Sequence, residues 1–113
     1  MELLAHTDDV TEFCRQARDE GLVGIDMEFE RERTYRPVLQ LVQAATRERS
    51  VLIAPLAIED LSPLWEMIAD PEVELIVHAG MQDMEIAFAE SGGLVPKNVF
   101  DTQIAAALLG MGE

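Results

Sequence analysis

Apolar runs of strand length alternate along this chain with segments in which apolar residues recur at helical spacing. The runs cover residues 22–29, 38–45, 50–54 and 73–77, and they are bounded mainly by glycine, proline or charged residues. Short runs bounded in this way predict strands. The chain is therefore expected to contain a sheet of at least four strands.

Two of these strands carry a further prediction about burial. In the second, Leu39, Leu41 and Gln43 are expected to face one side of the sheet, with Val42 and Ala44 on the other. The last of the four is predicted to be buried on both faces, as in the centre of a parallel sheet.

Helical spacing predicts four helices. The first runs from Asp8 to Glu20, with an N-cap offered by Thr7-Asp8-Asp9, a stop at Gly21, and Cys14 on its buried stripe. The second opens at Ser62-Pro63 and carries Trp65, which is expected to pack it on the sheet.

The last two predicted helices lie in the C-terminal third. One follows Ala79-Gly80 and ends at Ser91-Gly92-Gly93. A short extended piece, Val99-Phe100, leads into the other, which opens at Asp101-Thr102.

The order of these elements predicts an α/β fold with a mixed sheet flanked by helices. Short polar connections at 30–37 and 46–49 favour an antiparallel meander of the first three strands. A right-handed helical crossover then places strand 73–77 parallel beside strand 22–29. Both strands end at one sheet edge, where open α/β sheets build their sites.

Composition limits the class of protein. The 113 residues suffice for one domain, and the single cysteine, Cys14, excludes an internal disulfide framework. Neither a signal peptide nor a membrane span is predicted, so we expect a soluble, cytoplasmic protein. Twenty-two acidic and eight basic residues give a net charge of −14, which argues against non-specific affinity for nucleic acid.

The basic residues are nevertheless clustered. Five of the eight lie within a short stretch after the first predicted strand: Arg31, Arg33, Arg36, Arg47 and Arg49. They are interpreted either as the solvated rim of a hairpin or as a patch that contacts phosphates.

Asp26 and Glu28 lie one residue apart at the end of the first predicted strand. Since side chains alternate along a strand, both acids face one side, and Met27 and Phe29 face the other. The two acids repel each other, and a bound Mg²⁺ or Mn²⁺ would reverse that repulsion. The alternative is a polar strand end that runs into solvent.

Asp83 lies in the first turn of the third predicted helix, directly after the strand expected beside Asp26. It is therefore expected within reach of Asp26 and Glu28. An acid in a first turn also complements the helix dipole and needs no further function. Its placement beside the paired acids favours a shared metal site.

Two polar residues near this edge remain open to several interpretations. His78, at the end of strand 73–77, is interpreted as a neutral metal ligand, a phosphate contact or a hydrogen-bonded core histidine. Asp101 is predicted to be the N-cap of the last helix.

Four segments together resemble the ribonuclease D family of 3′–5′ exonucleases, part of the DEDD superfamily with a ribonuclease H-like fold. They are Ile25–Phe29, Arg33–Gln43, His78–Glu85 and Phe100–Gln103. The resemblance covers nearly the whole chain. It implies hydrolysis of 3′-terminal phosphodiester bonds of single-stranded RNA in tRNA-type processing, with release of nucleoside monophosphates and two divalent metals, Mg²⁺ or Mn²⁺.

The resemblance also implies roles for particular residues. Asp26 would bridge or anchor the metals, Glu28 would complete one coordination shell and orient the terminal nucleotide, and Asp83 would hold the second metal. Met27 replaces a more usual threonine, but it faces away from the acids. Arg33, Arg36 and His78 are expected to contact substrate. Phe29, Met81 and Met84 are interpreted either as an apolar wall against the terminal base or as core residues.

The family's third motif, which supplies a fourth aspartate and a tyrosine that positions water, has no match in residues 1–113. The chain is therefore interpreted as a partial exonuclease domain with little activity of its own. The alternative is a nuclease-like binding module without catalysis. A Rossmann-type nucleotide-binding domain is excluded, because no glycine-rich loop follows the first strand.

Overall fold

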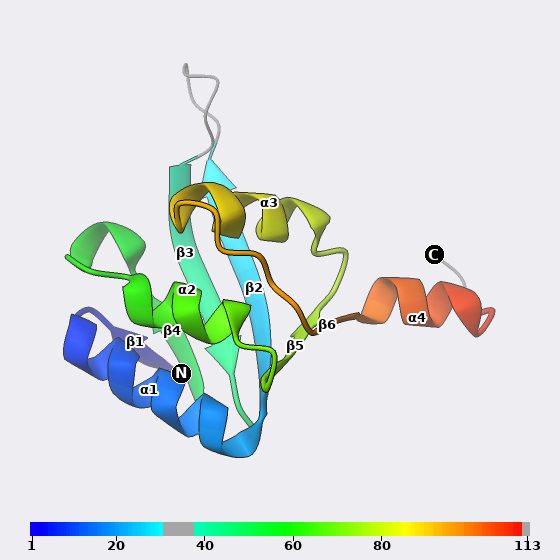
Figure 1. Ribbon diagram of the computed structural model, residues 1–113, viewed down its shortest axis with the longest axis horizontal. Coiled ribbons are helices and arrows are strands. Elements are labelled where there is room, and N and C mark those ends of the chain that lie inside the picture. The colour runs from blue at the N-terminus through cyan, green and yellow to red at the C-terminus, as the bar shows by residue number, and fades with distance from the viewer. Residues whose placement is uncertain (31–37, 112–113) are drawn as a thin grey trace.

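The computed structural model, which describes residues 1–30 and 38–111, is a six-stranded mixed sheet with helices (Figure 1). The strands are β1 (Glu2–Leu4), β2 (Leu22–Glu30), β3 (Val38–Ala45), β4 (Ser50–Ile53), β5 (Glu74–Val77) and β6 (Val99–Asp101). The helices are α1 (Thr7–Glu20), η1 (Pro55–Ala57, a 3₁₀ turn), α2 (Ser62–Ala69), α3 (Met81–Glu90) and α4 (Thr102–Leu108).

The sheet has the strand order β1-β4-β3-β2-β5-β6. The β2–β3 and β3–β4 pairs are antiparallel, while β5 lies parallel to β2. These pairings confirm the predicted meander and the predicted parallel placement of β5 beside β2. Strands β3 and β2 are the two central strands, and β2 pairs with β3 on one side and β5 on the other.

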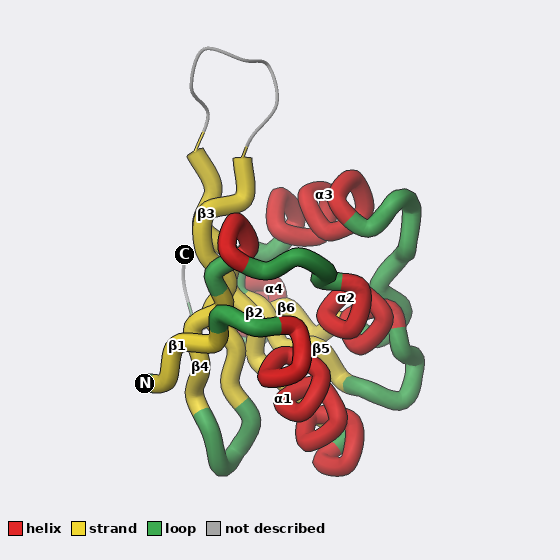
Figure 2. The backbone as a smooth tube through the Cα atoms, turned by 90° about the vertical axis from the view of Figure 1, so that its left-hand side faces the viewer, coloured by secondary structure: helices red, strands yellow, loops and turns green. Residues whose placement is uncertain are grey.

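Helices α1, α2 and α3 lie on one side of this sheet, as Figure 2 shows. Helix α1 buries the predicted stripe, which includes Phe13 and Cys14, and α2 buries Leu64 and Trp65. Burial raises the pKa of the Cys14 thiol to about 12, so this cysteine is a core residue as predicted. No helix in the described ranges is long and apolar enough to cross a membrane.

Two strands were not recognised in the sequence. Strand β1 pairs in parallel with β4 at one edge of the sheet, and its three residues are too short to produce a period-2 pattern. The extended piece before the last helix is strand β6, which pairs in parallel with β5 at the opposite edge.

One prediction of side-chain direction and one of burial were wrong. The register of β2 and β3 shifts between Glu28 and Phe29, and this bulge turns Leu39 into the core beside Val42 and Ala44. Strand β5 buries Leu75 and Val77 but leaves the alternate residues Glu74 and Ile76 half-buried, because α1–α3 all cover the same side of the sheet.

The start of α1 also differs from the prediction. Its N-cap is His6, which makes no side-chain capping bond. The Thr7 hydroxyl instead donates to the carbonyl of Asp60 and accepts from its amide, both at 3.3 Å. The residue predicted as a cap therefore ties the start of α1 to the segment before α2.

Candidate active site

The two acids of the central strand lie on one face of β2, as the alternation predicts. Asp26 and Glu28 are exposed, and Met27 between them is buried. Across the antiparallel pair, Asp26 stands opposite Gln43 of β3. The acids therefore project from the sheet face opposite to the one that carries the core.

Asp83 reaches this strand from the first turn of α3. It is 8% exposed, and its Oδ2 accepts a hydrogen bond of 3.2 Å from the amide of Met27. The pairing of β2 with β5 ends at Gly24 and Ile76. The Met27 amide thus lies beyond the last residue of β2 that is paired with β5, and it takes its hydrogen-bond partner from α3.

Its bond to the Met27 amide places Asp83 beside Asp26, whose charge acts on it. Burial raises the pKa of the Asp83 carboxyl, the bond from the Met27 amide lowers it, and the negative charge of Asp26 raises it further. A cation would relieve the cost of ionising Asp83 beside the negative charge of Asp26.

Glu28 does not complete a three-residue cluster with these two acids. Across the described residues, no three acidic, histidine or cysteine side chains are arranged closely enough to hold one metal ion. The structure brings Asp26 and Asp83 together and places Glu28 on the same strand face as Asp26. Its role, and the assignment of all three as metal ligands, stays a prediction.

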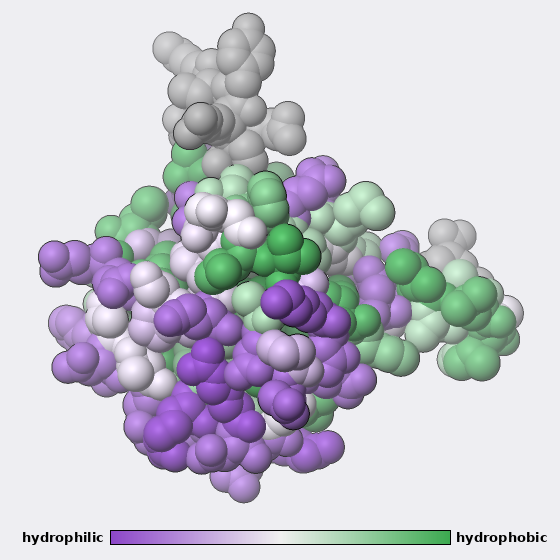
Figure 3. Space-filling model, viewed as in Figure 1, coloured by the Kyte–Doolittle hydropathy of each residue, from purple (hydrophilic) through white to green (hydrophobic). Residues whose placement is uncertain are grey.

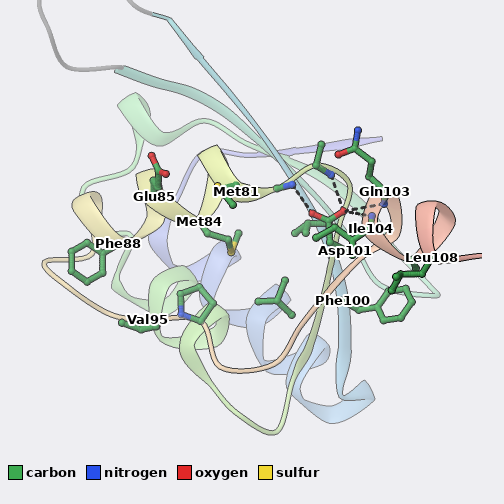
Figure 4. Close-up of a pocket in the computed structure, with 16 residues that line it drawn as sticks. Met81, Met84, Glu85, Phe88, Val95, Phe100, Asp101, Gln103, Ile104 and Leu108 are labelled. Atoms are coloured by element: carbon green, nitrogen blue, oxygen red, sulfur yellow. Dashed lines mark hydrogen bonds between the residues drawn. The ribbon is translucent and has the colours of Figure 1, made fainter. Parts of the chain in front are cut away.

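The turn between β5 and α3 is fixed by polar contacts from Asp101. This carboxylate accepts hydrogen bonds of 3.0 Å from the amides of Ala79 and Gly80, and it caps α4 through the amides of Gln103 and Ile104 (Figure 4). The bond from the Gly80 amide is the main reason that the pKa of Asp101 lies below its ordinary value. The predicted N-cap is confirmed, and it also anchors the preceding turn.

His78 is exposed, so its interpretation as a core histidine was wrong. Its Nδ1 lies 2.7 Å from the Thr102 hydroxyl, which donates to the Val77 carbonyl at 3.2 Å. In the tautomer that lets Thr102 keep its bond to Val77, Nδ1 is the donor and Nε2 is left as an acceptor. His78 lines a hollow of about 480 Å³ together with Asp26, Gln43 and Thr102.

The other residues predicted to contact substrate are placed differently. Phe29 and Met84 are half-buried and pack against the core, whereas Met81 is 75% exposed. Arg33 and Arg36, with Arg31, lie outside the described residues.

Arg49 of the predicted basic cluster has a structural role. Its guanidinium forms a 2.6 Å ion pair with Glu2, bonds Gln16 at 2.6 Å and lies 5.7 Å from the centre of the Phe13 ring. These contacts hold β1 and α1 to the start of β4. Neither a hairpin rim nor a phosphate patch describes this residue.

A larger apolar groove of about 1030 Å³ lies beside the turn, between α3, β6 and α4. Its walls include Met81, Met84, Phe88, Phe100 and Leu108 (Figure 4). Figure 3 shows that α4 presents a hydrophobic surface that stands away from the rest of the molecule. The sequence pattern did not reveal this groove, because its residues are far apart along the chain.

Comparison with known proteins places the chain among nucleases. It is 45% identical over 112 residues to Ribonuclease D of Gluconacetobacter diazotrophicus, covering 98% of this chain and 28% of that protein. It is 38% identical over 109 residues to Ribonuclease D of Escherichia coli, covering 96% of this chain and 29% of that protein. The chain therefore spans less than a third of the length of these relatives.

Solved structures agree with these similarities. The crystal structure of Escherichia coli RNase D, an exoribonuclease involved in structured RNA processing, matches with a TM-score of 0.88 at 38% identity, over 96% of this chain and 29% of that one. The catalytic core of RRP6 from Trypanosoma brucei shares the fold, with a TM-score of 0.86 at 20% identity over 98% of this chain and 31% of that one.

A single family covers the whole of the sequence. The model of the 3′–5′ exonuclease family matches residues 1–113, which include both elements that carry the neighbouring acids, β2 and α3. The ribonuclease H-like fold implied by the sequence agrees with the RNase D and RRP6 structures. The chain belongs to the 3′–5′ exonuclease family.

Proposed function

We propose that this chain supplies part of the catalytic domain of a 3′–5′ exoribonuclease that removes nucleotides from the 3′ end of single-stranded RNA. The observation that carries the proposal is the juxtaposition of Asp26 and Asp83, in which the charge of one raises the pKa of the other. The similarity to Ribonuclease D supports RNA as the substrate.

The donor set fits a hard divalent cation such as Mg²⁺ or Mn²⁺. Carboxylate oxygens are the preferred ligands of such ions, and two neighbouring carboxylates offer them here. When bound, divalent cations activate water and stabilise negative charge on a phosphodiester. Among proteins with this fold, crystal structures exist of the EXD2 exonuclease domain soaked in Mn and GMP and of Trypanosoma brucei RNase D in complex with RNA U12.

The protein's own residues would divide the work of binding and orientation. Asp26 and Asp83 would hold the cations, and Glu28 would complete one ligand set and orient the terminal nucleotide. Asp83 is fixed by its bond to the Met27 amide, so its carboxylate is oriented before any ligand binds. His78 would offer Nε2 from the same hollow that contains Asp26, and Met81 an exposed apolar surface for a base.

Manganese binding tests the metal assignment. We expect Mn²⁺ to raise the melting temperature of the chain, because a ligand that binds only the folded state stabilises it. Asp26→Asn and Asp83→Asn should each abolish the rise, while Glu66→Gln, at an exposed position on α2, should keep it. A rise that persists in both Asp→Asn variants would place the cation elsewhere.

Degradation of a 3′-labelled RNA tests the reaction. We propose that a third motif, of the Tyr-x-x-x-Asp type, comes from residues outside the present sequence. A version extended through that motif should degrade the RNA with Mn²⁺, and Asp83→Asn should reduce its rate by several orders of magnitude. Equal rates for the extended and unextended chains would refute the proposed division of the domain.

A non-catalytic nuclease-like module is the second candidate. The lack of a three-ligand cluster among the described residues favours it. Binding of RNA by the extended version without any degradation in Mn²⁺ would select this candidate.

A further inference from the structure

Asp101 and Thr102 bind four consecutive residues that lead into α3. The Thr102 hydroxyl donates to the carbonyl of Val77 at 3.2 Å and accepts from Nδ1 of His78 at 2.7 Å. The Asp101 carboxylate accepts from the amides of Ala79 and Gly80, each at 3.0 Å. Two adjacent side chains at the start of α4 thus contact every residue from 77 to 80.

The turn that they hold has little conformational freedom. Ala79 has a φ of 53°, in the left-handed region that residues other than glycine rarely occupy. A Cβ on Gly80 would lie 2.6 Å from Cγ2 of Val77, so this residue packs directly on the end of β5. Such a conformation persists where the surrounding contacts determine it, and the four hydrogen bonds from the two side chains supply these contacts.

Gly80 connects this turn to the candidate site. Its amide is held by Asp101, and its carbonyl accepts the amide of Met84 at 2.9 Å, which opens the hydrogen-bonded ladder of α3. Asp83 lies in that same turn of helix and accepts the amide of Met27 in β2. A continuous path of short contacts therefore leads from Asp101 through Gly80 to Asp83.

We propose that Asp101 and Thr102 are positioning residues that fix the turn at 77–80 and thereby hold Asp83 against β2. The proposal deepens the proposed function, because it assigns the residues that place one of its carboxylates. Neither residue needs to touch a metal or the RNA, because each acts through the backbone of the turn.

Hydrogen exchange of the Met27 amide tests the proposal directly, since this amide donates to Asp83. It is measured by NMR in the 113-residue chain without metal or RNA, relative to amides of the β2–β3 ladder. We expect Asp101→Ala to accelerate exchange at Met27 about tenfold relative to that ladder, the factor expected for loss of a capping carboxylate. Thr102→Val should act in the same direction, and Thr102→Ser, which keeps the hydroxyl, should not.

A matched variant separates positioning from a general loss of stability. Asp60 accepts the amide of Ser62 at 2.9 Å where α2 begins, so Asp60→Ala also removes an acid at a helix start. Asp60→Ala should accelerate Met27 and the ladder amides equally. The proposal would be overturned if Asp101→Ala and Thr102→Val accelerated exchange at Met27 and at the ladder amides equally, or changed neither. Thr102→Val also keeps the test decisive if Asp101→Ala does not fold.

A second readout links the positioning to catalysis. In the extended, RNA-degrading version, Thr102→Val should lower kcat and leave KM nearly unchanged, with rescue by Thr102→Ser. An unchanged kcat in Thr102→Val, together with accelerated exchange at Met27, would overturn the link to Asp83's proposed role. Exchange is measured without substrate, so a failure of the nuclease assignment leaves its outcome unaffected.

Discussion

The region from β1 to β5 and the segment from His78 to Met111 differ in how they treat apolar side chains. Most of the buried apolar residues lie in the first region. Among the described residues, the second region contributes Ile86 and Ala87 to the core. Most of the exposed large apolar side chains lie in the second region, among them Phe100 and Leu108. One region is a sealed sheet-and-helix layer, and the other presents apolar surface around a groove.

The candidate site lies where these two regions meet. Asp26 and Glu28 lie on β2 of the sealed layer. Asp83 belongs to α3, and Asp101 binds the turn from which α3 begins. A rigid strand therefore fixes one half of the site, and hydrogen bonds to a turn fix the other. The two halves should therefore respond to different kinds of substitution.

The same truncation at two leucines provides the strongest test of the comparison. Leu64 on α2 is fully buried, and Leu108 on α4 is 82% exposed. Leu64→Ala should lower the free energy of unfolding by about 2–5 kcal/mol, because it removes buried methyl groups and leaves a cavity. Leu108→Ala should change it by no more than about 0.5 kcal/mol.

Urea denaturation of the two variants measures both values. A loss from Leu108→Ala comparable to that from Leu64→Ala would show that α4 packs against another surface in solution. The comparison between a sealed and an open region would then be wrong.

A methyl group added at two glycines tests the junction between the regions. The Cβ of Gly80→Ala would lie 2.6 Å from Val77 Cγ2, while that of Gly24→Ala would meet its nearest atom at 3.9 Å. Because Val77 is buried, Gly80→Ala should cost about 1–3 kcal/mol. Gly24→Ala in β2 should be neutral or slightly stabilising, by up to about 1 kcal/mol. Thermal melting compares them, and equal melting temperatures would show that the turn yields freely.

The sealed layer was largely predictable from the sequence, because its apolar residues keep a regular period. Strand β3 was predicted with its observed bounds, α1 and β2 within one residue, and the start of α2 at Ser62. The bulge beside Glu28 was missed, because a single extra residue in one strand does not interrupt an apolar pattern.

The site was predictable in part. The neighbourhood of Asp26 and Asp83 followed from strand alternation and from the crossover rule. The second contact of Asp101, with the amides of Ala79 and Gly80, did not follow from the sequence. A capping signal describes the helix that follows an acid and carries no information about a distant turn that the same carboxylate binds.

Stability against pH distinguishes the two aspartates that flank this turn, since their pKa values shift in opposite directions. Both shifts start from an ordinary value of 3.8. Backbone amides, that of Gly80 foremost, lower the pKa of Asp101, so its charged form stabilises the fold above pH 3.8 and this contribution is lost as the pH falls through the lowered value. Asp101→Asn should therefore reduce the melting temperature at neutral pH, with a difference that fades in acid.

Asp83→Asn should behave in the opposite way. Burial raises the pKa of Asp83, so the folded state favours the protonated carboxyl, and stability is lost as the pH rises through the raised value. An uncharged Asn avoids that loss. Asp83→Asn should match the wild type below pH 3.8 and melt at a higher temperature at neutral pH. A lower melting temperature at neutral pH would mean that the Met27 bond outweighs the cost of burying the charge.

The smallest expected effect concerns the strain at Ala79, whose φ of 53° is left-handed. This conformation costs a residue with a Cβ about 1–2 kcal/mol, while glycine costs about 0.5–1 kcal/mol in backbone entropy. Ala79→Gly should therefore raise the free energy of unfolding by about 0.5 kcal/mol, as the difference between these terms. Ala54→Gly is the matched control, because its φ of −96° suits alanine, and it should be destabilising by about 0.5–1 kcal/mol. Urea denaturation of both variants measures the difference. Equal losses of the free energy of unfolding at the two positions would show that Ala79 is unstrained. Asp101 and Thr102 would then hold a turn that adopts its conformation without them.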